Sequence, residues 1–488
     1  MKSRLLTALA AFAAVVSLAS CSGVKNECTV NCGGGGTPSL SVTLAAVPFV
    51  PPPNTSILSF AVTINSVSLT PTSGGSDVNI PLNATTYSVD LTRLQSDSSF
   101  LGHVIANVPS GTYNKVTVGV TSAVVTYCTA SSGTPGCNTG SVAQITKGAA
   151  APATTAFSLT LAANQQAGLQ VLFNFGNAMT VNATTQVVSG VDLTVANVVT
   201  AIPLPPAAST LAAGEFDYVE DVTGVVTAAS SSSVTVLTST RGSITSAITN
   251  SSIGSPNCVI TNQVCSPQIG QIASIDATLN SDGTFTLLEY DPLSPTSVDV
   301  IEGIVTTVPS SSTQFQIVTN DVVLATTNSL IGSNLSLGDP VQVTFTGTNP
   351  FVLDTKGLPF VITAFRGSTS ATDILPGQTV ALRVTAFTPK AGNVPAAATV
   401  DYVVLRFTRV AASVFSSPSP LFGIQSLPPF FGQTGTNQVQ LGTGSPSTYL
   451  VGYTSSSSIT VGDNVAVRAL YFGRTAAPSF TAAKVRKH

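Results

Sequence analysis

A seven-residue block recurs four times in the second half of the chain, and it limits the possible folds more than any other feature. In each copy an apolar residue and a glycine precede alternating apolar positions, with Pro376 replacing the apolar residue in the third copy. The copies span residues 269–275, 337–343, 376–382 and 461–467. Glycine permits the positive φ of a tight turn that leads into a strand, and the Asp or Gln that follows it can hydrogen-bond to nearby backbone. The repeat therefore predicts modular β structure.

The composition also favours strands. The chain is 43% hydrophobic but only 8% charged, and its Val, Ile and Leu residues alternate with Thr and Ser. Helical surfaces normally rely on Lys, Glu, Arg and Gln, whereas alternation of this kind is typical of half-buried strands. We therefore expect an all-β protein.

Charge and rare residue types argue against several functions. The net charge is -3, and we expect the basic cluster of Lys484, Arg486 and Lys487 to be a solvated tail, so nucleic-acid binding is disfavoured. The chain has two His and no Trp. With so few His residues, a His-based metal site or a Ser-His-Asp triad is disfavoured. We expect no cofactor and no enzyme activity.

The N-terminus has the features of an export signal. Lys2 and Arg4 precede an apolar run over residues 5–18, which is too short to span a bilayer but suits a secretory signal. The run ends in Leu-Ala-Ser before Cys21, which resembles the lipobox of bacterial lipoproteins. That resemblance implies cleavage after residue 20 and acylation of Cys21. Ser22, and not Asp, follows Cys21. In lipoproteins of Gram-negative-type bacteria, this resemblance implies sorting to the outer membrane, on the cell surface or the periplasmic face.

Six further cysteines form three couples that are local in sequence. They are Cys28 with Cys32, Cys128 with Cys137, and Cys258 with Cys265. Each couple could close a short loop as a disulfide, which requires an oxidising compartment. A zinc site is the weaker alternative, because neither CxxC spacing nor accompanying His is present.

The region 39–201 has the pattern of an antiparallel β-sandwich. Apolar residues alternate along segments such as 58–64, 116–120 and 169–175, and turn sequences separate these segments. The stretch 41–126, which includes Val108-Pro109-Ser110-Gly111-Thr112-Tyr113, resembles domain of unknown function 4382, found in bacterial lipoproteins.

The glycine blocks fall in a region that resembles a second family. Matching strand starts, such as Val222-Thr223-Gly224 and Ile301-Glu302-Gly303, stand upstream of two copies. Their arrangement resembles domain of unknown function 5666, a small β-barrel family of exported bacterial proteins. We therefore predict tandem OB-like barrels after the sandwich. The expected division is a signal peptide (1–20), a lipidated tether (21–38), the sandwich (39–201), a linker (202–214) and three barrels (215–297, 298–367 and 368–488), the last of which could be one barrel or two.

Two features are candidate binding sites. Asp217, Glu220 and Asp221 belong to the densest acidic cluster; calcium is a weak candidate there, and a solvated strand is the favoured interpretation. The loop containing Pro428, Pro429, Phe430 and Phe431 would be a partner site if it is exposed, but burial over its own barrel is the favoured alternative.

These observations favour a non-catalytic lipoprotein anchored in the outer membrane. We expect an elongated envelope or cell-surface protein that binds a protein or polysaccharide or serves a structural role. The alternative is a carbohydrate-binding surface protein, and a glycan-active enzyme is a distant third.

Overall fold

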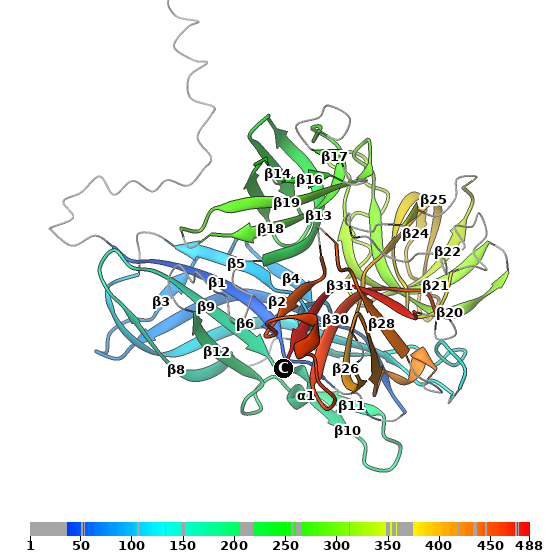
Figure 1. The fold of residues 1–488 in the computed structure, drawn as a ribbon, viewed down its shortest axis with the longest axis horizontal. Coiled ribbons are helices and arrows are strands. Elements are labelled where there is room, and N and C mark those ends of the chain that lie inside the picture. The colour runs from blue at the N-terminus through cyan, green and yellow to red at the C-terminus, as the bar shows by residue number, and fades with distance from the viewer. Residues whose placement is uncertain are drawn as a thin grey trace, which may run out of the picture.

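The computed structural model describes residues 37–488 with gaps at 50–51, 53, 105–107, 132, 149–151, 205–217, 251, 255–257, 260–265, 281, 312, 348–351, 354–357, 359–373, 418, 433–436, 445–446, 474–475 and 477. Strands form nearly all of the regular structure in these residues, so the predicted all-β fold is confirmed (Figure 1). Within the same residues, no helix has the length and apolar character needed to cross a membrane.

The N-terminal module is a sandwich of two sheets. One has the strand order β12 (Val199–Leu204), β9 (Gln166–Phe173), β1 (Ser39–Ala46) and β5 (Ser99–Val104). The other has the order β3 (Val78–Ile80), β2 (Ser56–Pro71), β6 (Gly111–Cys128) and β7 (Ala143–Lys147), with β4 (Tyr87–Asp90) also on β2 and β8 (Ala153–Leu161) also on β6. Helix α1 (Phe175–Ala178) precedes a ribbon of β10 (Met179–Val181) and β11 (Val188–Val191).

The alternating residues fill the core between these sheets. Phe60, Val62, Val116 and Val171 are all buried in one cluster, as a period of two requires when one strand face is covered. One pairing departs from the antiparallel pattern, because β1 and β9 run parallel. This is possible because a long stretch of chain connects the two strands and brings β9 back in the same direction.

Three barrels follow, and all have the same topology. The first consists of β13 (Tyr218–Ala229), β14 (Ser233–Leu237), β15 (Ser243–Ala247), β18 (Ile272–Leu279) and β19 (Phe285–Ser294). The second consists of β20 (Val300–Ser311), β21 (Gln314–Val323), β22 (Pro340–Phe345), β24 (Thr379–Thr388) and β25 (Ala396–Arg406). The third consists of β26 (Thr408–Ser416), β27 (Leu421–Gln425), β28 (Asn437–Leu441), β30 (Asn464–Tyr471) and β31 (Phe480–Lys487).

In each barrel the first strand pairs with the second and the fourth, and the third closes on the fifth in parallel. This is the five-stranded OB-type barrel that we predicted. Short extra strands accompany the fifth strand of each barrel: β16 (Ile253–Gly254) with β17 (Cys258–Val259), β23 (Val352–Leu353) and β29 (Tyr449–Val451).

The glycine turns form as predicted. The φ angles at Gly270, Gly338, Gly377 and Gly462 are +88°, +86°, +93° and +93°. The polar residue after the glycine secures the turn: the Leu375 N–H donates to Gln378 Oε1 at 2.9 Å, and the Thr460 N–H donates to Asp463 Oδ2 at 2.8 Å. Each turn therefore fixes where a strand begins.

The boundary expected between the second and third barrels, at residues 367 and 368, is wrong. β24 and β25 follow that boundary but pair with β20 and β22, so they complete the second barrel. The third barrel is a single unit that begins at β26. The glycine turns misled the count because Gly338 precedes the third strand of the second barrel, whereas the other three glycines precede a fourth strand.

The four modules pack around a shared interior and not in an elongated row (Figure 1). Phe100 of the sandwich packs edge-on against Phe285 of the first barrel, with ring centroids 5.0 Å apart. Leu470 of the third barrel lies in the core cluster of the second, and Leu58 of the sandwich lies in that of the third. The expectation of an elongated protein is therefore wrong, because each module buries apolar side chains against others.

Candidate functional site at the junction of the modules

A cluster of buried charged residues occupies the place where the four modules meet. We call it the junction network: Arg93 and Asp97 from the sandwich; Asp221, Arg241 and Asp276 from the first barrel; Glu302, Asp321 and Arg406 from the second; and Arg409, Arg468 and Lys484 from the third. A buried charge is costly unless an opposite charge and hydrogen bonds compensate it. The network therefore forms only when all four modules are in place.

Asp221 is the centre of this network. Its Oδ1 lies 2.9 Å from Arg406 Nη2 and 2.7 Å from Arg468 Nη2, and its Oδ2 pairs with Arg409. The backbone takes φ +50° here, at a bulge in β13, and the Asp221 N–H donates to Asp276 Oδ1 at 2.8 Å. One carboxylate of the first barrel thus binds guanidinium groups from the second and third barrels.

Arg93 connects the sandwich to the second barrel. Its Nη1 lies 2.9 Å from Glu302 Oε1 and 3.3 Å from Asp321 Oδ2, and Asp321 also pairs with Arg241. Burial alone would lower the pKa of Arg241, but the neighbouring carboxylate of Asp321 raises it, so this group stays charged. Burial raises the pKa of the adjacent Tyr87 to about 12.

The basic cluster near residue 484 is part of the junction and is not a solvated tail. Lys484 and Arg486 are buried in β31, and Lys484 Nζ lies 3.8 Å from Asp97 Oδ1. Arg409 Nε lies 3.0 Å from the other oxygen of Asp97. Only Lys487 of the cluster is exposed. The expectation was wrong because these cations alternate with residues that face the barrel core.

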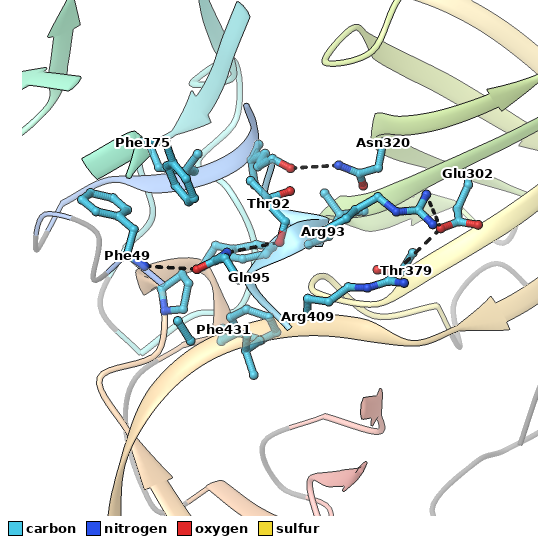
Figure 2. A pocket seen from close by; sticks show the side chains of 17 residues that line it. Phe49, Thr92, Arg93, Gln95, Phe175, Glu302, Asn320, Thr379, Arg409 and Phe431 are labelled. Atoms are coloured by element: carbon cyan, nitrogen blue, oxygen red, sulfur yellow. Dashed lines mark hydrogen bonds and ion pairs between the residues drawn. The ribbon is translucent and has the colours of Figure 1, made fainter. Parts of the chain in front are cut away.

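A small cavity of about 60 Å³ lies beside the network (Figure 2). Its lining includes the aromatic side chains of Phe49, Phe175, Phe430 and Phe431 and the polar side chains of Thr92, Arg93, Gln95, Glu302, Asn320 and Arg409. The polar groups hold one another: the Phe49 N–H donates to Gln95 Oε1 at 3.1 Å, and Gln95 Nε2 donates to the Thr92 carbonyl at 3.2 Å. The cavity has room for a few water molecules or a small neutral group.

The junction is therefore a set of buried ion pairs that connect the modules. Its cations and carboxylates are paired with each other, as Arg93 is with Glu302 and Arg406 is with Asp221. Among the described residues, no three His, Cys, Asp or Glu side chains are grouped so as to hold a metal ion.

The structure describes only one of the three acidic side chains that we considered for calcium, that of Asp221. Asp217 and the side chain of Glu220 lie outside the described residues. Asp221 is fully buried and binds arginines, so it is not a calcium ligand. The physical reason is that three guanidinium groups already provide the positive charge that a cation would supply.

The proline and phenylalanine loop is buried, as its favoured alternative stated. Pro429, Phe430 and Phe431 form the short turn η3 (Pro429–Phe431), and both phenyl rings are at most 2% exposed. Phe431 packs edge-on against Tyr471, with ring centroids 5.1 Å apart. The loop is therefore not available to an external partner.

One of the three cysteine couples can be checked. Cys128 and Cys137 form a disulfide with a Cα–Cα distance of 5.7 Å. Cys21, Cys28, Cys32 and Cys265 lie outside the described residues, as does the side chain of Cys258, so their predictions remain untested.

The arginines of the network are the residues that sequence reasoning missed. Arg406 and Arg468 are among the largest fully buried side chains of the protein. A signal was present, because each interrupts an apolar strand, in Leu405-Arg406-Phe407 and Val467-Arg468-Ala469. In a chain with so few charges, an arginine between core residues indicates a buried ion pair.

The fold and its junction define a class of all-β proteins in which a sandwich and three OB-type barrels share one interior. Residues 41–202 match the family model described as "Domain of unknown function (DUF4382)", which confirms the resemblance of the N-terminal module. No curated protein matches the chain.

A streptococcal protein is among the solved structures that match part of the chain. It is titled a multidomain protein with nucleic acid binding domains from Streptococcus pneumoniae TIGR4, at 9% identity over 55% of this chain and 72% of that chain, with a TM-score of 0.10. A similarity this low carries no argument about fold or function.

Proposed function

We propose that the protein is an exported lipoprotein, anchored in the outer membrane through Cys21, that acts as a non-catalytic binding or structural module of the bacterial envelope. The junction network is the observation that carries the proposed binding or structural role. Buried ion pairs such as Arg406 with Asp221 and Arg93 with Glu302 join different modules. Such contacts favour one rigid body that presents fixed outer surfaces, and not a hinge that closes around a substrate.

Two further observations support export. The signal-like N-terminus ends at a cysteine in a lipobox-like sequence. The disulfide between Cys128 and Cys137 is of the kind that persists in oxidising compartments. Two or more acyl chains on Cys21 would anchor the protein stably.

The proposal is tested by protease treatment of cells that express the full-length protein, with permeabilised cells as a control. Cys21→Ala should release the protein from the membrane fraction, and Ser22→Asp should move it from the outer to the inner membrane. Loss of the barrels from intact cells would place them on the surface, whereas protection until permeabilisation would place them in the periplasm. Unchanged membrane association of Cys21→Ala would refute lipid anchoring.

Carbohydrate binding is the second candidate, and the outer face of the second barrel favours it. Gln316 and Gln342 lie on β21 and β22 between core residues, so they face away from the barrel interior. Gln316 Nε2 donates to Gln342 Oε1 at 3.0 Å. With Gln314 and Thr344 beside them, this face offers uncharged amides and a hydroxyl, which suit the hydroxyl groups of a sugar.

This candidate predicts saturable binding to at least one polysaccharide in a panel of envelope and plant glycans. Replacing Gln316 and Gln342 by Ala should weaken that binding, whereas replacing the exposed Thr385 of the same barrel should not. Flat binding curves for the wild-type protein across the panel would remove the candidate.

A further inference from the structure

The loop closed by the Cys128–Cys137 disulfide reaches out of the sandwich and contacts two barrels. Cys128 ends β6 and is fully buried, and the disulfide spans a sequence separation of 9. The Cys137 N–H donates to the carbonyl of Thr306 in the second barrel at 2.7 Å. The Gly136 N–H donates to the carbonyl of Phe430 in the third barrel, also at 2.7 Å.

Gly136 is closely fitted at this contact. Its φ is +103°, and an added Cβ would lie 3.2 Å from both the Thr306 carbonyl oxygen and the ring of Pro376. A side chain at this position would meet both the unfavourable backbone conformation and the second barrel. The position of the loop is therefore set by its contacts as well as by the disulfide.

Phe430 is held from both sides by the sandwich. Its carbonyl accepts from Gly136, and its N–H donates to Ser56 Oγ at 3.0 Å. Ser56 is paired with Cys128 in the register of β2 and β6, so both contacts come from the same end of the sandwich. Phe430 and Phe431 in turn form part of the wall of the junction cavity.

We propose that the Cys128–Cys137 disulfide is a redox-dependent clamp that holds η3 as a wall of the junction cavity. Oxidation removes two electrons and two protons from the two thiols and forms the S–S bond; an oxidoreductase disulfide accepts them and becomes a dithiol. With the bond formed, Gly136 and Cys137 are fixed next to Phe430 and Thr306. For the reverse step, a dithiol oxidoreductase supplies two electrons and two protons and becomes a disulfide. With the bond reduced, the loop regains conformational freedom, η3 loses its hydrogen bond to Gly136, and the cavity opens on that side.

Hydrogen exchange of the full-length protein tests the clamp. Cys128→Ser with Cys137→Ser is compared with Cys258→Ser with Cys265→Ser, which removes the other expected couple outside the tether. We expect the Phe430 amide, whose acceptor Ser56 lies outside the loop, to exchange faster by about tenfold in the first variant only. Amides of β30 should keep their protection, because the barrel itself remains folded.

A second pair of variants leaves the disulfide intact. Gly136→Ala should raise exchange at Phe430, whereas Gly140→Ala should not, because Gly140 has a φ of +69° but no atom within 4 Å of an added Cβ. If Phe430 stays protected in both the double serine variant and Gly136→Ala, the disulfide stabilises only its own loop and the proposal is wrong. If β30 also loses protection in the serine variant, the third barrel itself is destabilised there, and exchange in Gly136→Ala tests the proposal. Faster exchange at Phe430 in Gly136→Ala then supports the clamp, and unchanged exchange refutes it.

Discussion

Replacing Asp221 by Asn tests whether the junction network stabilises the protein. Asn has nearly the same shape as Asp and also tolerates the left-handed backbone conformation found here, φ +50°, so the substitution removes the charge with little backbone strain. Arg406 and Arg468 would then lose the carboxylate oxygen that lies 2.9 and 2.7 Å away. These two guanidinium groups, and that of Arg409 on the other carboxylate oxygen, would remain buried with part of their charge uncompensated.

The expected cost is large. Two unit charges about 4 Å apart attract by roughly 4 kcal/mol at an effective dielectric constant of about 20. Breaking a buried ion pair by removing one partner typically costs about 3–5 kcal/mol. We therefore expect Asp221→Asn to lower the free energy of unfolding by about 4 kcal/mol.

Urea unfolding followed by circular dichroism measures this change, because urea, unlike guanidinium, does not screen charges. A loss of about 4 kcal/mol should lower the urea midpoint by about 1 M or more. The difference should persist in high salt, since buried pairs are screened much less than exposed ones. Asp192→Asn is the matched control, because Asp192 is only partly buried and accepts its hydrogen bond from Thr194 in its own loop. Equal midpoints for the two variants would refute a stabilising role for the network.

Three further predictions concern the turns, the aromatic cluster and pH. Gly270→Ala should cost about 1 kcal/mol from its backbone conformation alone, whereas Gly377→Ala should cost about 3 kcal/mol, because its Cβ would lie 2.5 Å from the ring of Phe431; urea midpoints compare them. Phe431→Ala should cost about 3–5 kcal/mol in the same assay by leaving a cavity, and a cost below about 1 kcal/mol would contradict its role in the core. Burial lowers the pKa of His103, so its folded pKa lies below the unfolded value of 6.5. The unfolded chain then binds the proton more readily, and stability falls as the pH drops below about 6.5. Thermal unfolding between pH 7.5 and 5.5 should show a smaller loss for His103→Gln; identical pH profiles would contradict this.

Local features of the fold could be predicted because they depend on neighbouring residues. Strand alternation at Phe60 and Val116 identified the buried face of the sandwich, since a strand turns every second side chain to the same side. The glycines at 270 and 462 identified tight turns, since few other residues adopt a positive φ at low cost. The short sequence separation of Cys128 and Cys137 likewise made their disulfide predictable.

The site could not be predicted because it depends on contacts between modules. Arg406 and Asp221 are 185 residues apart, and nothing in the sequence near either one indicates the other. The predicted domain boundary was wrong for the same reason. β25 completes the second barrel by pairing with β22 and β24, and the glycine turn before β24 does not indicate this pairing.

The sequence by itself determined the class of fold, the strand faces, the glycine turns and one disulfide, because short-range backbone geometry and side-chain periodicity fix these. Only the tertiary structure decided that the few charged residues would gather at one buried junction and that the backbone of Phe430 would bond to the sandwich. The physical reason is that a buried charge or aromatic ring is stable only against a complementary partner, and the chain supplies that partner from a distant module.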